Sequence, residues 1–232
     1  MKRISIIIPA YKEEDYIEET LSKLDFIRRK SDGVYKMEII VVVNGEKDNT
    51  ENIAQRYANK VIHSNMGPSA ARNKGAAEAQ GEIYVFLDAD TQISENLIEE
   101  IIKHTNEPVI GTAKALPEVQ NFKAKMLTFI KNFLLKTGLC KGSNGIIFCP
   151  SETFKKSGGF DERLFVGEIH DFYKRALKHS KYIYLDSCYV IPSLRRYEKK
   201  GYLKTLFFWI KWSIFYLFNK HSKVEKNYDF VR

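Results

Sequence analysis

The sequence has few cysteines, prolines and glycines, and it contains no internal repeats. Its 232 residues include three cysteines, six prolines and 13 glycines. The cysteines lack the spacing of metal ligands, and their odd number argues against a disulfide framework, so a reducing compartment is expected. There are no low-complexity tracts or flexible linkers, and 44% of the residues are hydrophobic and 28% charged. This composition is that of an ordinary globular protein.

Long hydrophobic runs are also absent. The apolar run Ile4–Ile8 is cut by Pro9, which makes it too short for the apolar region of a signal peptide and typical of a first core strand. Residues 203–218 are apolar and aromatic, but these sixteen residues include Lys204 and Lys211. They fall short of the roughly 20 apolar residues needed to span a bilayer. Neither segment predicts a membrane-spanning helix.

The positive charge is concentrated at the C-terminus. Residues 195–232 contain ten Lys or Arg against three acidic residues, which gives +7 of the net charge of +8. In a helix, Lys200, Lys204 and Lys211 would share one stripe, and the tryptophans of this segment suit a lipid headgroup boundary. The segment predicts an interfacial helix on an anionic membrane surface. Packing against the domain or against another subunit are the open alternatives.

This charge distribution also bears on partners and location. An apolar helix with few, separated charges is a poor track for phosphates, so no nucleic-acid partner is expected. We expect a protein that lies peripherally at the cytoplasmic face of the cell membrane, or in the cytoplasm.

The order of expected elements predicts an α/β fold. Apolar runs typical of strands alternate with segments of helical periodicity, and this alternation favours a largely parallel central sheet with flanking helices. We expect one domain over residues 1–200 and a basic, aromatic extension with a C-terminal helix over residues 201–232. Strands are expected at residues 4–8, 37–43, 61–63, 83–87, 109–115, 145–149, 182–185 and 189–191, and helices near residues 13–30, 48–57, 68–79, 122–136, 151–156 and 168–179.

Two carboxylates follow the expected strand at residues 83–87. Strand alternation would point Asp88 and Asp90 in the same direction, at an edge where α/β folds bind ligands. Two oxygen ligands at such an edge suit Mg²⁺ or Mn²⁺ shared with substrate phosphates. The alternative is a polar turn that ends the strand, with Thr91 or Ser94 capping the next helix.

Further polar segments stand at strand C-termini or helix N-termini, where nucleotides gather in such folds. They are Pro9–Glu14, Val43–Asp48 and Asn65–Asn73. With the Asp88/Asp90 pair, their order and spacing resemble the inverting GT-A glycosyltransferases of family 2, over most of the chain. The resemblance implies a Rossmann-like GT-A fold and transfer of a sugar from a UDP- or GDP-sugar donor to a lipid-linked or saccharide acceptor, with Mn²⁺ or Mg²⁺.

The resemblance also implies donor-binding residues in the first half. Pro9, Tyr11 and Glu13 resemble the family's first nucleotide-binding segment, in which an aromatic ring borders the base and an acid bonds base or ribose. For Glu13 the alternative is helix capping. Asn44 stands where the family usually has the second of two acids, with Val43 in place of the first, and its amide can both donate to and accept from a base edge.

Charged residues complete the implied donor site. Arg72 resembles the family's cation near the donor phosphates or base, with a surface arginine as the alternative. Asp88 is implied near ribose and metal, and Asp90 as the direct metal ligand. Arg195 and Arg196 resemble an Arg-Arg element that would neutralise the departing diphosphate, with a basic surface loop as the alternative.

Weaker matches follow in the second half. Gly142–Gly145 resembles a loop that helps to form the acceptor site, and Gly158–Glu162 resembles a Gly-Gly-Phe-Asp-Glu signature whose glycines are expected at positive φ. Where the family often carries its general base, this chain has Ile169. Glu168 is the nearer substitute, kept ionised by a pKa that the helix dipole would lower, and Asp171 is the second candidate.

The loss of acids at Val43 and Ile169 leaves two other interpretations. An acceptor that is an ionised lipid phosphate would have less need of a base. Alternatively, the protein is a catalytically silent, membrane-bound relative that acts as a scaffold, which Mn²⁺-dependent binding or hydrolysis of a nucleotide-sugar would exclude.

Overall fold

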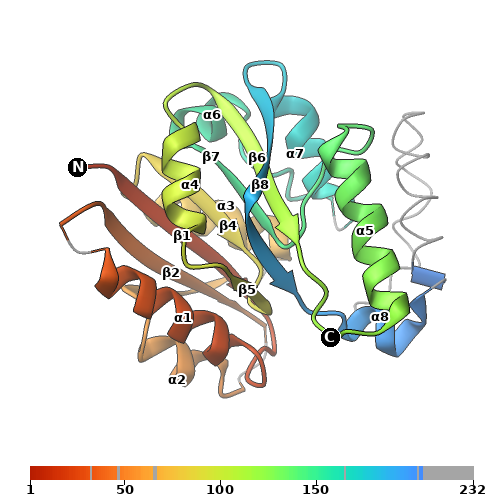
Figure 1. The fold of residues 1–232 in the computed structure, drawn as a ribbon. Helices are drawn as coiled ribbons and strands as arrows, with labels where there is room; N and C mark the ends of the chain where they lie inside the picture. Colours follow the sequence, from red (N-terminus) through yellow and green to blue (C-terminus); the bar gives the residue numbers. More distant parts are fainter. Residues whose placement is uncertain (32, 46–47, 65–66, 165, 203, 206–232) are drawn as a thin grey trace.

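The computed structural model describes residues 1–202, except 32, 46–47, 65–66 and 165, together with residues 204 and 205. Figure 1 shows strands and helices alternating along most of this length. The elements are β1 (Arg3–Ala10), α1 (Ile17–Lys30), β2 (Lys36–Asn44), α2 (Thr50–Gln55), β3 (Lys60–Ser64), α3 (Pro68–Glu78), β4 (Ile83–Leu87), β5 (Thr91–Ile93), α4 (Leu97–His104), β6 (Val109–Ala115), α5 (Phe122–Lys136), β7 (Ile146–Pro150), α6 (Ser151–Lys156), α7 (Glu168–Ala176), β8 (Lys181–Pro192) and α8 (Arg195–Lys200).

The described strands form one eight-stranded sheet in the order β3-β2-β1-β4-β7-β6-β8-β5. The pairs β3–β2, β2–β1, β1–β4 and β6–β8 are parallel, and the other three are antiparallel. The expected α/β class with a mostly parallel central sheet is therefore confirmed. Strands β2, β1 and β4 end at the same edge, where the polar segments of the sequence gather.

Helices cover both faces of this sheet (Figure 1). On β1, Ile4, Ile6 and Ile8 point to the face covered by α1, α2 and α4, while Ile7 points to the face that packs against α3, α6 and α7. Alternate side chains face opposite sides of a strand, so a continuous apolar run indicates burial on both faces. Burying one such side chain stabilises the fold by about 1.5–3 kcal/mol.

Several elements differ from the expectation. The two short strands expected at residues 182–185 and 189–191 form one strand, β8, whose pairing with β6 is irregular between Ala113 and Lys114. β5 and α4 were not expected. β5 has only three residues, too few for a periodic signal. The basic segment at Arg195 is the short helix α8 rather than a surface loop.

The C-terminal extension was predicted as a separate unit with an aromatic helix. Residues 203 and 206–232 lie outside the described residues, so that helix and the domain boundary near residue 200 stay predictions. Within the described part of the chain, no helix has both the length and the apolar character needed to cross a bilayer.

Candidate active site

Asp88 and Asp90 lie in a turn and not on a continuation of β4. β4 ends at Leu87, and the amide of Thr91 donates to the carbonyl of Asp88 at 3.2 Å. The hydroxyl of Thr20 on α1 donates to the carbonyl of Ala89 at 2.9 Å. The expectation of strand alternation is therefore wrong, and the turn positions the two carboxylates instead. Neither capping alternative holds, because the N-cap of α4 is Asn96.

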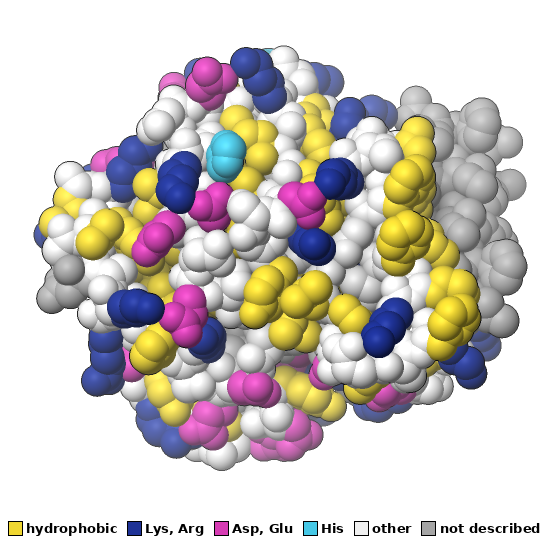
Figure 2. All heavy atoms as spheres, viewed as in Figure 1, with side chains coloured by type: hydrophobic (Ala, Val, Ile, Leu, Met, Phe, Trp, Pro, Cys, Tyr) yellow, Lys and Arg dark blue, Asp and Glu magenta, His cyan; other side chains and the backbone are white. Residues whose placement is uncertain are grey.

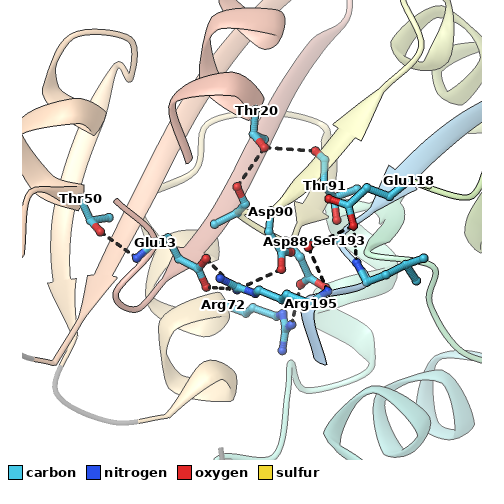
Figure 3. Close-up of polar contacts among 12 residues, drawn as sticks. Glu13, Thr20, Thr50, Arg72, Asp88, Asp90, Thr91, Glu118, Ser193 and Arg195 are labelled. Carbon is cyan, nitrogen blue, oxygen red and sulfur yellow. Dashed lines mark hydrogen bonds and ion pairs between the residues drawn. The ribbon is translucent and has the colours of Figure 1, made fainter. Parts of the chain in front are cut away.

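Arg72 on α3 bridges two carboxylates from distant segments, and Figure 3 shows its contact with Asp88. Its Nη2 lies 3.2 Å from Oδ1 of Asp88, and its Nη1 lies 3.2 Å from Oε1 of Glu168. The guanidinium stacks over the ring of Phe160, 5.3 Å from the ring centroid. Only 6% of the Arg72 side chain is exposed, so the surface-arginine alternative is excluded.

Arg195 makes a second bridge on the other side of the site. Its Nη2 lies 2.7 Å from both carboxylate oxygens of Glu13 and 2.9 Å from Oδ2 of Asp90. Its guanidinium stacks on Tyr16 at 4.4 Å from the ring centroid. The Glu13 side chain binds Arg195, its backbone carbonyl accepts from the amides of Tyr16 and Ile17, and α1 has no side-chain cap hydrogen bond. The capping alternative for the Glu13 side chain does not hold.

Short backbone contacts hold Arg195 in place, 182 residues from Glu13. β5 pairs with the end of β8, with Thr91 opposite Pro192. The amide of Ser193 donates to the carbonyl of Asp90 at 3.1 Å, and the amide of Leu194 donates to Oε2 of Glu118 at 2.6 Å. The Ser193 bond ties the segment after β8 to the Asp88–Asp90 turn, and the Leu194 bond ties it to Glu118 after β6 (Figure 3).

The site is electrostatically strained. Burial, followed by the charge of Asp88, raises the pKa of Asp90 to about 6, against the lowering effect of Arg195. Burial also raises the pKa of Glu168, although Arg72 opposes the rise. The predicted lowering by the helix dipole is therefore wrong, because desolvation of a carboxyl group exceeds the dipole effect here. Four carboxylates and two guanidinium groups leave these six ionised side chains with a charge of −2.

The Asp88/Asp90 pair fits a divalent cation. Two nearby carboxylates, one of them desolvated and repelled by the other, are a donor set that bound Mg²⁺ or Mn²⁺ would stabilise. Among the described residues, no group of three or more His, Cys, Asp or Glu side chains has the arrangement of a metal site. With Asp88 and Asp90 as ligands, substrate phosphates and water would complete the coordination, which is usual for Mg²⁺.

The predicted base-binding residues lie together at the ends of β1 and β2. A Cβ added to Gly45, which has φ +83°, would lie 2.3 Å from the ring of Tyr11. Only glycine allows this close approach at such a backbone conformation. Pro9 is opposite Val42 in the β1–β2 register, and Asn44 ends β2. Tyr11 and Asn44 therefore border one region beside Glu13.

Glu168 and Asp171, the two candidate bases, have different partners. Glu168 begins α7 and reaches Arg72. Asp171 accepts from Nε of Arg175 at 2.7 Å, and Arg175 also donates to the carbonyls of Ser157 and Gly159. Ile169 packs against the aromatic core cluster. The structure brings Glu168 into the carboxylate–arginine group and places Asp171 in a contact that holds a loop.

Other motif residues contribute through hydrogen bonds to the backbone or through their own backbone conformation. The side chain of Asn73 donates to the carbonyl of Phe160 and accepts from its amide, both at 2.8 Å. This joins the two motifs that the sequence separates by 87 positions. Gly158 and Gly159 have φ of +73° and +68°, which confirms their expected positive φ. The carbonyl of Gly145 accepts from the amide of Asp88 at 2.9 Å, so the expected acceptor loop borders the carboxylates.

Sequence reasoning did not identify Thr20, which fixes the carboxylate turn, or Lys131 on α5. Burial lowers the pKa of Lys131, and the nearby groups that act on it include Asp88 and Arg196. Lys131 and Arg196 therefore lie on the α5 side of the site, while Arg195 lies on the Glu13 side. A lysine within a helix that has four of them carries no local signal that sets it apart.

Comparison with known proteins agrees with this geometry. A family model described as Glycosyl transferase family 2 matches residues 5–154. A dolichyl-phosphate beta-glucosyltransferase of Trichomonas vaginalis is 34% identical over 149 residues, 56% of this chain and 45% of that protein. An uncharacterized glycosyltransferase of Rickettsia typhi is 32% identical over 210 residues, 82% of this chain and 63% of that protein. The chain thus spans less than two thirds of the length of either relative.

Solved structures confirm the fold. The mannosyltransferase PcManGT of Pyrobaculum calidifontis, in complex with GDP-Man and Mn²⁺, superposes with a TM-score of 0.67 over 87% of this chain and 59% of that one, at 20% identity. At this identity the similarity shows the GT-A fold alone. Because the family model covers more than half of its residues, the chain belongs to glycosyltransferase family 2.

Proposed function

We propose that the protein transfers a sugar, with inversion, from a UDP- or GDP-sugar to a lipid-linked or saccharide acceptor, with Mn²⁺ or Mg²⁺. The observation that carries the proposal is the pair Asp88/Asp90 held between Arg72 and Arg195, next to the region bordered by Tyr11 and Asn44. The name of the Trichomonas relative states a dolichyl-phosphate acceptor, and PcManGT was solved with a nucleotide-sugar and Mn²⁺.

The donor would bind across the ends of β1, β2 and β4. Tyr11 would border the base, Asn44 and Glu13 would hydrogen-bond base or ribose, and the chain at Pro9 would line the same region. Asp88 would support the ribose and the metal, and Asp90 would ligate the metal. When bound, the metal neutralises charge that develops on the leaving diphosphate.

The arginines would exchange partners when the donor arrives. In the structure Arg195 forms ion pairs with Asp90 and Glu13. These are the carboxylates that the metal and the ribose would bind. If Arg195 turned from these carboxylates to the diphosphate, its guanidinium group would have an anionic partner both before and after donor binding. The planar guanidinium group also suits bidentate contacts with phosphate. Arg196, one residue further along α8, would contact the same leaving group.

Glu168 is the better placed of the two candidate bases. Its buried carboxylate has a raised pKa, which makes it a stronger proton acceptor, and Arg72 stabilises the ionised form that a base requires. It would take the proton of the acceptor hydroxyl while the hydroxyl oxygen bonds to the anomeric carbon. The bond from that carbon to the diphosphate oxygen breaks, and its electron pair leaves with the diphosphate.

A panel of UDP, GDP and their sugars, with and without Mn²⁺ or Mg²⁺, tests the donor and metal by thermal shift. We expect metal-dependent stabilisation by one nucleotide series in the wild type and none in Asp90→Asn. Glu95→Gln, which removes an exposed carboxylate paired with Lys23 and Lys30, is the matched control. Absence of both metal-dependent nucleotide-sugar binding and nucleoside diphosphate release would favour the silent scaffold instead.

The location at the cytoplasmic face of a membrane, the anionic membrane partner and the absence of a nucleic-acid partner belong to the same proposal. So does the division into a domain of residues 1–200 and an extension of residues 201–232.

A further inference from the structure

Helix α5 has an exposed apolar face. Phe122, Met126, Phe129 and Phe133 are exposed by 77%, 43%, 70% and 54%. Their spacing of four, three and four positions places them on one side of a helix. We call these four residues the α5 stripe. Figure 2 shows hydrophobic side chains gathered in a column over the position that α5 has in Figure 1.

The opposite side of α5 already attaches the helix to the domain. Ala124 and Leu127 are buried in a small cluster with Leu194 and Tyr197 of the α8 region. The Asn132 side chain donates to the carbonyl of Ala115 at 2.8 Å and accepts from its amide at 2.9 Å. The helix is therefore fixed without the α5 stripe. Isolated exposed apolar residues need no explanation, but a contiguous apolar face indicates a binding surface.

The charges of α5 indicate the kind of surface that it binds. The helix contains four lysines and no acidic residue: Lys123, Lys125, Lys131 and Lys136. Among the described residues, neither Lys123 nor Lys125 forms an ion pair. Exposed aromatic side chains flanked by lysines are the pattern of a helix that lies in the interface of an anionic bilayer, with its rings among the acyl chains and its ammonium groups at the lipid phosphates.

The position of α5 relative to the site supports this partner. Asn132 also accepts from the side chain of Asn144 at 3.1 Å, in the loop whose Gly145 binds the backbone of Asp88. Lys131 lies close enough to Asp88 for that charge to affect its pKa. One helix therefore has its apolar side exposed and another side bonded to the loop that borders Asp88. A surface bound by the stripe would lie next to the acceptor side of the site.

We infer that α5 is a docking helix that inserts the α5 stripe into an anionic lipid surface and brings the site beside lipid-linked acceptors. The acceptor class rests on the proposed function, whereas the docking does not. This surface is distinct from the C-terminal segment for which membrane contact was predicted, because it belongs to the folded domain.

The test is flotation of the full-length protein with phosphatidylcholine vesicles, with and without phosphatidylglycerol, in the absence of nucleotide and metal. We expect the wild type to float with the anionic vesicles. The triple variant Phe122→Ser, Phe129→Ser, Phe133→Ser should lose at least about tenfold in partitioning, since burial of a single Phe contributes about that factor. Its melting temperature should stay unchanged, because the three rings are exposed.

Phe26→Ser is the matched control, since Phe26 is 50% exposed on α1, away from the stripe, and it should float as the wild type does. Undiminished flotation of the triple variant, with loss in the double variant Trp209→Ser, Trp212→Ser, would assign docking to the C-terminal segment and overturn the inference. The inference would also be overturned if the wild type did not float with anionic vesicles, if the wild type were a dimer that the triple variant dissociates, or if the melting temperature of the triple variant fell strongly. Because no nucleotide is present, the result is independent of whether the proposed activity holds.

Discussion

Replacing Asp90 with asparagine should stabilise the free protein while abolishing its metal-dependent nucleotide binding. Burial and the charge of Asp88 raise the pKa of this carboxyl group from 3.8 to about 6. Each pKa unit corresponds to about 1.4 kcal/mol, so ionised Asp90 costs the folded state up to about 3 kcal/mol. The side chain keeps 19% exposure, and we expect a gain of about 1–3 kcal/mol in Asp90→Asn.

The direction of this pKa shift determines how the stability difference between Asp90→Asn and the wild type changes with pH. Between pH 3.8 and about 6 the folded protein binds more protons at Asp90 than the unfolded chain does, so the contribution of this group to stability falls as pH rises through that window. The cost is fully present above about pH 7 and absent below pH 3.8. Asp90→Asn should therefore gain most over the wild type at pH 8 and progressively less toward pH 5. Arg195 keeps both oxygens of Glu13 as partners in the variant, so no buried charge is left unpaired.

Urea denaturation of both proteins at pH 5 to 8, with a chelator present, measures this difference. Asp161→Asn is the control of opposite sign, because the contact with Arg163 lowers the pKa of Asp161 to about 2. That variant should lose stability or show no change at neutral pH. A pH-independent loss of stability in Asp90→Asn would refute the conclusion that ionised Asp90 destabilises the folded protein. Undiminished Mn²⁺-dependent stabilisation by UDP or GDP would refute its assignment as a metal ligand.

Four further substitutions separate chemistry from structure. Glu168→Gln should lower turnover, measured as nucleoside diphosphate release, about 10²-fold or more with donor binding little changed. Asp171→Asn should lower the melting temperature and leave most turnover. Normal turnover in both variants would point to an acceptor that needs no base. Arg195→Met should cost about 3–5 kcal/mol in urea denaturation, because it leaves two buried carboxylates uncompensated, and a small loss would show that the bridge is not formed in solution. Gly159→Ala should cost about 1–2 kcal/mol from its left-handed backbone, plus the contact of the new Cβ at 2.8 Å from Oδ1 of Asn73; unchanged melting would contradict the observed loop conformation.

The first half of the fold could be predicted because its signals are local. Continuous β-branched runs such as Ile4–Ile8 and Met37–Val43 indicate strands buried on both faces, and the parallel arrangement then brings their C-terminal ends together. The polar residues after those strands had to meet at one edge. That reasoning assembled Tyr11, Asn44 and Asp88 correctly without any knowledge of individual contacts.

The rest of the site depends on contacts that local patterns do not encode. Arg195 reaches Glu13 only because a three-residue strand, β5, pairs with the end of β8, and so short a strand has no detectable periodicity. The pKa of Glu168 was predicted in the wrong direction for a similar reason. The helix dipole can be read from the position of Glu168 at the start of α7, but its desolvation comes from the packing of distant segments around it.

The charge of the carboxylate–arginine group gives a reason for donor and metal to bind together. Within this group, Glu13, Asp88, Asp90 and Glu168 outnumber Arg72 and Arg195, and the local charge of −2 would repel the roughly −2 charge of a nucleotide-sugar diphosphate. A divalent cation held by Asp88 and Asp90 would reduce that repulsion. It would also stabilise the ionised form of Asp90, which burial disfavours in the free protein, and would leave Arg195 available to the phosphates. If the proposed function holds, diphosphate affinity should therefore depend steeply on the metal.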